Sequence, residues 1–229
     1  AVDSTERRRL PAEMTNIHHL QFSPDGKTLA AAGGAPAQWG VVEFFDWPDG
    51  KRTARFDQHE DVIYDLDFAP DGSSWVCGSG DGICSVFGRG EKKPRARFSS
   101  HSRAVGAVKF LGDSSTIVSA SLDQTLRVWN SQSGEAIRTL HIHSRGVHAL
   151  ALRPQADGLP MVASSSADRT VRFWQPTIGR MVRFIRLPSE PLCITWWAKG
   201  TKLVAGCRDG KARIIDPDAV TLVDTVDVS

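Results

Sequence analysis

The sequence predicts an all-β protein built from repeated units, because one set of polar and aromatic residues returns at a nearly fixed interval. His59, His101 and His143 mark a period of 42 residues. Around each histidine, short stretches alternate apolar with small or polar residues and are separated by tight turns, as β-strands are. A period of about 40–45 residues with four short strands per unit is typical of a β-propeller blade. We therefore expect a β-propeller of four-stranded antiparallel blades.

The unit at residues 101–142 shows the expected strand order most clearly. Residues 104–110, 116–121 and 125–129 alternate in polarity, and a turn at 122–124 joins the last two stretches. The recurring residues are His101, Ser119, Asp123 and Trp129, then His143, Ser164, Asp168 and Trp174, and in weaker form His59, Cys77, Asp81 and Phe87. The gap from histidine to aspartate is 22 residues in two copies and 25 in the third, and the gap from aspartate to the aromatic residue is always 6.

These units resemble the repeats of the WD40 family, over about residues 9–229. The dipeptide motifs depart from the family pattern, since Gln-His, Ser-His and Ile-His stand where the family has Gly-His. The Trp-Asp pair that ends a blade is Trp129-Asn130 in one unit and Trp174-Gln175 in the next. The resemblance implies that the indole N–H, the hydroxyl, the imidazole and the carboxylate form a hydrogen-bonded chain that braces each blade.

The remaining units follow the same plan with losses and insertions. The first has a tight turn at 23–26 and about four extra residues within 35–39, and the second repeats the turn at 69–72. The fourth has a three-residue insertion near 156–160. The fifth keeps Asp209 but has Leu187, Ala205 and Ile215 at the other three positions, and a last strand is expected at about 221–228.

The repeat divides the chain into one propeller domain with five blades. Blade 1 is expected at residues 13–58, blade 2 at 59–100, blade 3 at 101–142, blade 4 at 143–186 and blade 5 at 187–229, and residues 1–12 hold the outer strand of a blade whose inner strands are absent, at Glu6–Leu10. Most members of the family close seven blades, so we expect a fragment of a seven-bladed ring that lacks about two blades. The alternatives are a five-bladed ring and a ring completed by association of copies.

Composition excludes several other classes of protein. The chain has 229 residues, 41% hydrophobic and 24% charged, and a net charge of +2 gives no reason to expect a polyanionic partner. No apolar run approaches the ~20 residues that a membrane span needs. Cys77, Cys84, Cys193 and Cys207 form no CxxC pair and are expected as small buried thiols in strands, which fits a reducing compartment such as the cytoplasm without fixing it.

Catalysis is not expected, although serine, histidine and aspartate are the residue types of a nucleophilic triad. The same set recurs one blade later, whereas a nucleophile is needed at one cleft and a brace is needed in every blade. The seven histidines complete no zinc set, and the glycine-rich stretches at 33–34 and 78–82 lack the lysine and the helix of a phosphate-binding loop. We therefore expect no catalytic residue, no metal and no cofactor.

The expected working surface is the top face around the mouth of the central channel, where partners of this family often dock. Family positions three and five residues after the blade histidine, and the position before the turn aspartate, give His18, Tyr64, His148, Glu190 and Arg208. Arg103 and Arg145 lie two residues after a blade histidine, and Trp39 lies in the inserted loop at 34–40. Tyrosine, tryptophan and arginine often dominate binding energy, which favours them as contacts. The alternative is that these are solvated rim residues, and that Trp39 covers the neighbouring blade.

The predicted function is a non-catalytic interaction or scaffolding module that binds a protein or peptide on the top face. One alternative is an accessory propeller attached to an enzymatic or electron-transfer domain of a longer chain. A minor alternative is nucleic-acid binding through Arg7–Arg9 and the arginines of the outer strands. Unpaired blade edges also make self-association of this chain a further alternative.

Overall fold

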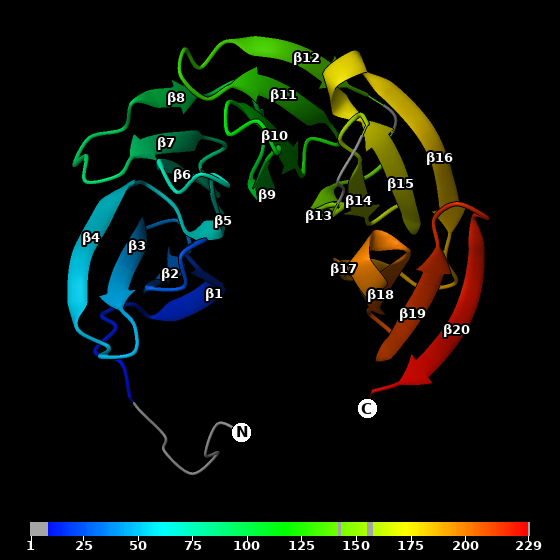
Figure 1. Cartoon of the computed structure of the whole chain (residues 1–229), viewed down its shortest axis with the longest axis horizontal. Coiled ribbons are helices and arrows are strands. Elements are labelled where there is room, and N and C mark those ends of the chain that lie inside the picture. Colours follow the sequence, from blue (N-terminus) through cyan, green and yellow to red (C-terminus); the bar gives the residue numbers. More distant parts are fainter. Residues whose placement is uncertain (1–8, 142, 155–157, 229) are drawn as a thin grey trace.

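The computed structural model describes residues 9–141, 143–154 and 158–228. These residues form five four-stranded antiparallel sheets, each built from strands consecutive in the sequence (Figure 1). The sheets stand side by side along an arc, with the first strand of each sheet on the inner side (Figure 1). The predicted all-β fold of four-stranded blades is therefore confirmed. No helix in the described part of the chain is long and apolar enough to cross a membrane.

Each sheet is one blade, numbered here in chain order. Blade 1 contains β1 (Asn16–Phe22), β2 (Thr28–Ala35), β3 (Trp39–Asp46) and β4 (Arg52–His59). Blade 2 contains β5 (Ile63–Phe68), β6 (Ser74–Ser79), β7 (Cys84–Gly88) and β8 (Ala96–Phe98). Blade 3 contains β9 (Val105–Phe110), β10 (Thr116–Ser121), β11 (Leu126–Asn130) and β12 (Ala136–Leu140).

Blades 4 and 5 follow the same order. Blade 4 contains β13 (Val147–Leu152), β14 (Val162–Ser166), β15 (Thr170–Gln175) and β16 (Arg180–Arg186), with a short 3₁₀ helix at Pro176–Ile178. Blade 5 contains β17 (Pro191–Trp197), β18 (Lys202–Cys207), β19 (Lys211–Asp216) and β20 (Thr221–Asp227), with a second 3₁₀ helix at Ala198–Gly200.

The hydrophobic core lies between neighbouring blades. Val76 and Val86 of blade 2 belong to one buried cluster with Val108 of blade 3. In the same cluster Phe98 stacks on Trp129, with ring centroids 5.0 Å apart. Each such buried side chain contributes about 1.5–3 kcal/mol by leaving water, so each blade depends on its neighbours for stability.

Within the described residues the arc is open, because blades 1 and 5 each lack one neighbour. Consecutive inner strands contact one another from β1 through to β17, and Figure 1 shows blades 1 and 5 at the two ends of the arc. One repeat position shows the consequence: Leu66 and Val108 are 0% exposed, whereas Leu20 of blade 1 is 56% exposed. The expected membership of a seven-bladed ring stays a prediction.

Three local features differ from the expectations. Residues 6–8 of the predicted outer strand at Glu6–Leu10 lie outside the described residues, and Arg9 and Leu10 carry no strand. The insertion at 34–40 extends the β2–β3 hairpin instead of forming a loop, because Ala35 pairs with Trp39. Cys193 is exposed on β17, since blade 5 has no following blade, while the other three cysteines are buried as expected.

Candidate functional site

Loops from neighbouring segments meet at one end of the blades, which we call the top face. The loop before each first strand is bonded to the turn between the second and third strands of the same blade. The backbone bonds run from Gly80 to Val62 at 2.8 Å, Leu122 to Ala104 at 2.9 Å, Ala167 to Gly146 at 3.0 Å and Arg208 to Glu190 at 2.9 Å. The turns between first and second strands lie at the other end, the bottom face. These bonds hold the top-face loops in place without relying on side chains.

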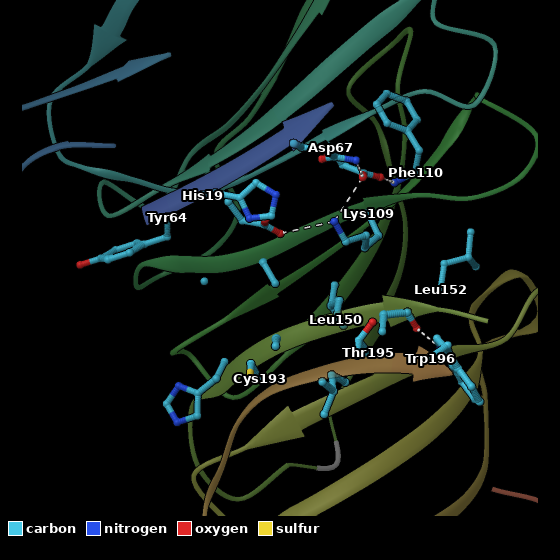
Figure 2. Close-up of a pocket in the computed structure, with 18 of the residues that line it drawn as sticks. His19, Tyr64, Asp67, Lys109, Phe110, Leu150, Leu152, Cys193, Thr195 and Trp196 are labelled. Atoms are coloured by element: carbon cyan, nitrogen blue, oxygen red, sulfur yellow. Dashed lines mark hydrogen bonds and ion pairs between the residues drawn. The ribbon is translucent and has the colours of Figure 1, made fainter. Parts of the chain in front are cut away.

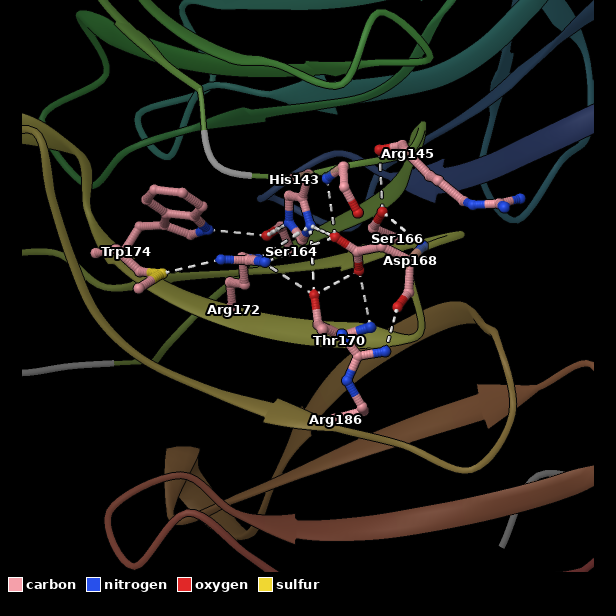
Figure 3. A network of polar contacts seen from close by, with 11 residues as sticks. His143, Arg145, Ser164, Ser166, Asp168, Thr170, Arg172, Trp174 and Arg186 are labelled. Atoms are coloured by element: carbon pink, nitrogen blue, oxygen red, sulfur yellow. Dashed lines mark hydrogen bonds and ion pairs between the residues drawn. The ribbon is translucent and has the colours of Figure 1, made fainter.

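Blade 4 holds a complete polar chain beneath the top face (Figure 3). The Trp174 Nε1–H donates to Ser164 Oγ at 2.8 Å, and Ser164 Oγ lies 2.8 Å from His143 Nε2. His143 Nδ1 lies 2.9 Å from an Asp168 carboxylate oxygen. Ser164 is 0% exposed and Trp174 is 1% exposed, so every member of the chain depends on its partners for hydrogen bonding.

The hydrogen-bonded chain of side chains lacks its indole member in blades 3 and 2. In blade 3, His101 lies 2.8 Å from both Ser119 Oγ and Asp123, but the buried Trp129 Nε1 has no partner among the described residues. In blade 2 the His59 ring lies 2.9 Å from Asp81, and the Cys77 sulfur lies 3.5 Å from its other nitrogen. Phe87 has no N–H and stacks on Trp75 instead, with ring centroids 4.2 Å apart.

The charges of the blade 4 chain favour a neutral imidazole held by an ionised carboxylate. Burial raises the pKa of Asp168, but hydrogen bonds from Thr170 and His143 outweigh it and lower that pKa to about 2. Burial and the nearby charge of Arg172 together lower the pKa of His143 more than Asp168 raises it. The same causes act on Asp123, whose pKa is about 2, and on His101. A fully buried hydroxyl between an indole and a neutral imidazole braces the blade and is closed to a substrate.

The inner strands line an open cavity of about 700 Å³ on the inner side of the arc, which we call the axial cavity (Figure 2). His18 of β1 and Tyr64 of β5 both line it, and their rings make an edge contact with centroids 5.2 Å apart. His148 of β13 lines the same cavity from another blade. The structure thus brings three of the predicted rim residues around one hollow.

A second group of predicted residues forms an ion-paired chain between blades 4 and 5. His148 Nε2 lies 2.7 Å from one carboxylate oxygen of Glu190, and Arg208 Nε lies 3.0 Å from the other. The Arg208 side chain is 68% exposed, whereas the Glu190 side chain is 17% exposed. Glu190 therefore positions a guanidinium group at the surface and an imidazole at the cavity.

The other predicted rim residues are not joined to these groups. Arg103 and Arg145 are exposed in the loops before β9 and β13. Among the described residues, Ser121 and Ser166 donate to their backbone carbonyls, and no partner is found for their side chains. Trp39 is the first residue of β3 and is half-buried, so it belongs to a strand instead of standing free on a loop.

A charged group in the cavity was not foreseen from the sequence. Lys109 Nζ lies 3.2 Å from Asp67 and 4.0 Å from Asp65, and His19 lies 2.8 Å from Asp65 (Figure 2). Burial lowers the pKa of Lys109, but the carboxylates of Asp65 and Asp67 raise it by a larger amount. The pKa therefore lies above its ordinary value and the ammonium stays charged. The backbone N–H groups of Val108 and Phe110 also donate to these two carboxylates, at 2.8 and 2.7 Å.

The sequence did contain a signal for this group. Residues 65 and 67 of β5 occupy the same repeat positions as 107 and 109 of β9, since each set pairs with the following strand in the same register. Opposite charges at matching positions of adjacent inner strands predict an ion pair across the seam between two blades. The group joins blades 1, 2 and 3 across the two seams between them.

Within the described ranges, no cluster of three or more histidine, cysteine, aspartate or glutamate residues is placed to hold a metal ion.

Comparison with known families agrees with the architecture. The family model described as WD domain, G-beta repeat, matches residues 50–87, 92–130 and 134–175, which together make up just over half of the chain. Each matched stretch starts near the outer strand of one blade and continues through three strands of the next. The sequence repeat is therefore offset from the structural blade by one strand. No curated protein matches the chain.

Proposed function

The chain belongs to the WD40 family, and from this premise we propose that it is a non-catalytic interaction module that binds a protein or peptide on its top face. WD40 repeats generally mediate protein–protein interaction or scaffolding, and the family is generally non-catalytic. The proposal rests on one observation. His18, Tyr64 and His148 of blades 1, 2 and 4 line the mouth of the axial cavity, and Glu190 and Arg208 of blade 5 are joined to it through the ion pair between His148 and Glu190.

The chemistry of this mouth suits an extended peptide with mixed side chains. Tyr64 and His18 offer aromatic surface with polar edges, while Arg208 offers guanidinium donors beside the partly buried carboxylate of Glu190. Tyrosine and arginine frequently supply the largest share of binding energy in interfaces. Cavities of several hundred cubic ångströms with a few convergent polar groups are typical ligand sites.

Crosslinking from the cavity mouth tests this proposal. A photoreactive amino acid placed at residue 64 should crosslink a partner in extracts, and the same group at Lys93 on the bottom face should not. The double change Tyr64→Ala and His148→Ala should then weaken the purified partner's binding at least tenfold, while Lys93→Ala leaves it unchanged. Equal crosslinking from both faces would refute a top-face site.

A specific observation supports a second role, self-association with another copy of this chain. Leu20 and Phe22 are 56% and 46% exposed, although the matching Leu66 and Phe110 are buried against a neighbouring blade. The exposed face of blade 1 thus repeats the packing surface that joins blades inside the chain. A head-to-tail contact between blade 5 of one copy and blade 1 of the next would continue it, and such contacts grow with concentration.

Light scattering over a range of protein concentrations tests this role. The molar mass should rise above 25.0 kDa as concentration rises, and Leu20→Glu should return it to the monomer value. A Lys27→Glu change, made outside the strands, is the control for added charge. A constant monomer mass at all concentrations would rule the contact out.

A further inference from the structure

Four arginines from different segments of blades 4 and 5 line one cavity of about 500 Å³ on the top face. They are Arg145 before β13, Arg169 after β14, Arg186 at the end of β16 and Arg208 after β18. All four are exposed. Figure 3 shows Arg145 and Arg186 on either side of Asp168. The fold therefore collects guanidinium groups that are up to 63 residues apart in sequence.

The two carboxylates of this cavity are already occupied. Asp168 accepts hydrogen bonds from His143, from Thr170 and from the backbone N–H of Ser144. Glu190 is held by His148 at 2.7 Å and by Arg208 at 3.0 Å. The cavity lining thus holds four guanidinium groups and two carboxylates that already accept hydrogen bonds, and its net charge is +2.

Most of the guanidinium donors have no protein acceptor. The side chains of Arg145 and Arg169 make no hydrogen bond or ion pair with any described residue, and Arg208 uses only Nε. Arg186 donates one N–H to the backbone carbonyl of Asp168, at 3.4 Å. A guanidinium group carries five N–H donors in a planar fork that fits carboxylate and phosphate oxygens in pairs. Donors on several sides of the cavity can therefore act on one ligand.

We propose that this cavity binds the phosphate of a phosphorylated serine or threonine in the partner peptide. A phosphorylated side chain carries a charge of about −1.5 to −2 and three acceptor oxygens, which match the net charge and the several donors better than a singly charged carboxylate does. The inference rests on the proposed top-face function and names the chemistry of its ligand. Since Glu190 bonds both Arg208 and His148, one peptide can contact this cavity and the axial cavity together.

The repeat supplies matched variants for a test. Arg169 has φ 64°, and blade 3 places Gln124 at the same turn position with φ 76°. Arg169→Gln therefore removes the charge with a residue that this turn already accepts elsewhere in the chain. Arg103 was a predicted rim residue and holds the position in blade 3 that Arg145 holds in blade 4, but it lines neither the axial cavity nor this one. Arg103→Gln is therefore the control for a loss of charge on the same face.

The assay is fluorescence anisotropy with a labelled pool of degenerate peptides that share a central phosphothreonine. We expect the phosphorylated pool to bind at least tenfold more tightly than the same pool with threonine or glutamate. Arg169→Gln should lower its affinity at least fivefold, and Arg103→Gln should leave it within twofold. Circular dichroism melting of each variant shows that the fold is kept.

Three results would overturn the proposal. They are equal binding of phosphorylated and unphosphorylated pools, equal losses in the Arg169 and Arg103 variants, and preferential binding of phosphoinositide vesicles or single-stranded DNA at the same residues. If Tyr64→Ala abolishes binding of a crosslinked partner while Arg169→Gln does not, the top-face function stands and the phosphate site is excluded.

Discussion

Replacing Ser164 by alanine is expected to destabilise the protein more than any other removal of a single hydroxyl group from a blade. In blade 4 this hydroxyl accepts from Trp174 at 2.8 Å and donates to His143 at 2.8 Å, and its residue is 0% exposed. Ser164→Ala leaves an indole donor and an imidazole acceptor without partners and without access to water. An unsatisfied buried group costs about 1–3 kcal/mol, so we expect a loss of about 2–4 kcal/mol.

The chain contains two matched controls for this loss. Ser165 lies next to Ser164 on the same strand and is also 0% exposed, but its hydroxyl has no partner among the described residues. Ser165→Ala should therefore change stability by less than about 0.5 kcal/mol. Ser119→Ala in blade 3 should lower the free energy of unfolding by about 1–2 kcal/mol, a loss between those of the other two substitutions. The reason is that Trp129 already lacks an acceptor there and only His101 loses a partner.

Urea denaturation measures these differences in the free energy of unfolding, and thermal melting followed by circular dichroism checks them. In a chain of this size 1 kcal/mol shifts Tm by about 2–4 °C, so Ser164→Ala should lower Tm by several degrees and Ser165→Ala should leave it nearly unchanged. Equal effects of the two substitutions would refute the assignment of the hydroxyl as the link in the blade 4 brace. They would show that the cost comes from packing alone.

Two further predictions concern charge. Because the pKa of Asp168 is lowered to about 2, the unfolded state binds more protons, and stability present above pH 4 should be lost as pH falls from about 4 towards 2. The lowered pKa of His143 acts in the same direction, so loss of stability should begin as pH falls below about 6.5, which urea midpoints measured from pH 8 to pH 3 would show. Lys109→Met should cost about 2–3 kcal/mol in urea unfolding, near the lower end of the range for a broken buried pair since its side chain keeps 19% exposure. Adding Asp67→Asn should recover part of that loss, and no recovery would argue against the ion pair as the cause.

Much of the fold follows from the sequence because it depends on local and periodic features. Alternating strands, tight turns and a 42-residue period can be recognised directly in the sequence, and each blade is made of strands that are consecutive in the sequence. The histidine–aspartate pairs were predictable for the same reason, since both residues lie in one blade and bond at 2.8–2.9 Å. Recurrence in three blades also indicated their structural role, because a catalytic nucleophile is needed at one cleft only.

The candidate sites depend on contacts between blades, and these the sequence only partly determined. Repeat positions placed His18, Tyr64, His148, Glu190 and Arg208 on one rim, but which of them touch depends on side-chain reach across seams between blades. Trp39 was predicted on a free loop and lies in a strand, because a few added residues extended a hairpin. The arginine cavity and the Lys109 group combine residues from two or three blades. Their chemistry exists only once the blades are packed at a fixed angle, and that angle is set by side-chain packing of the whole core.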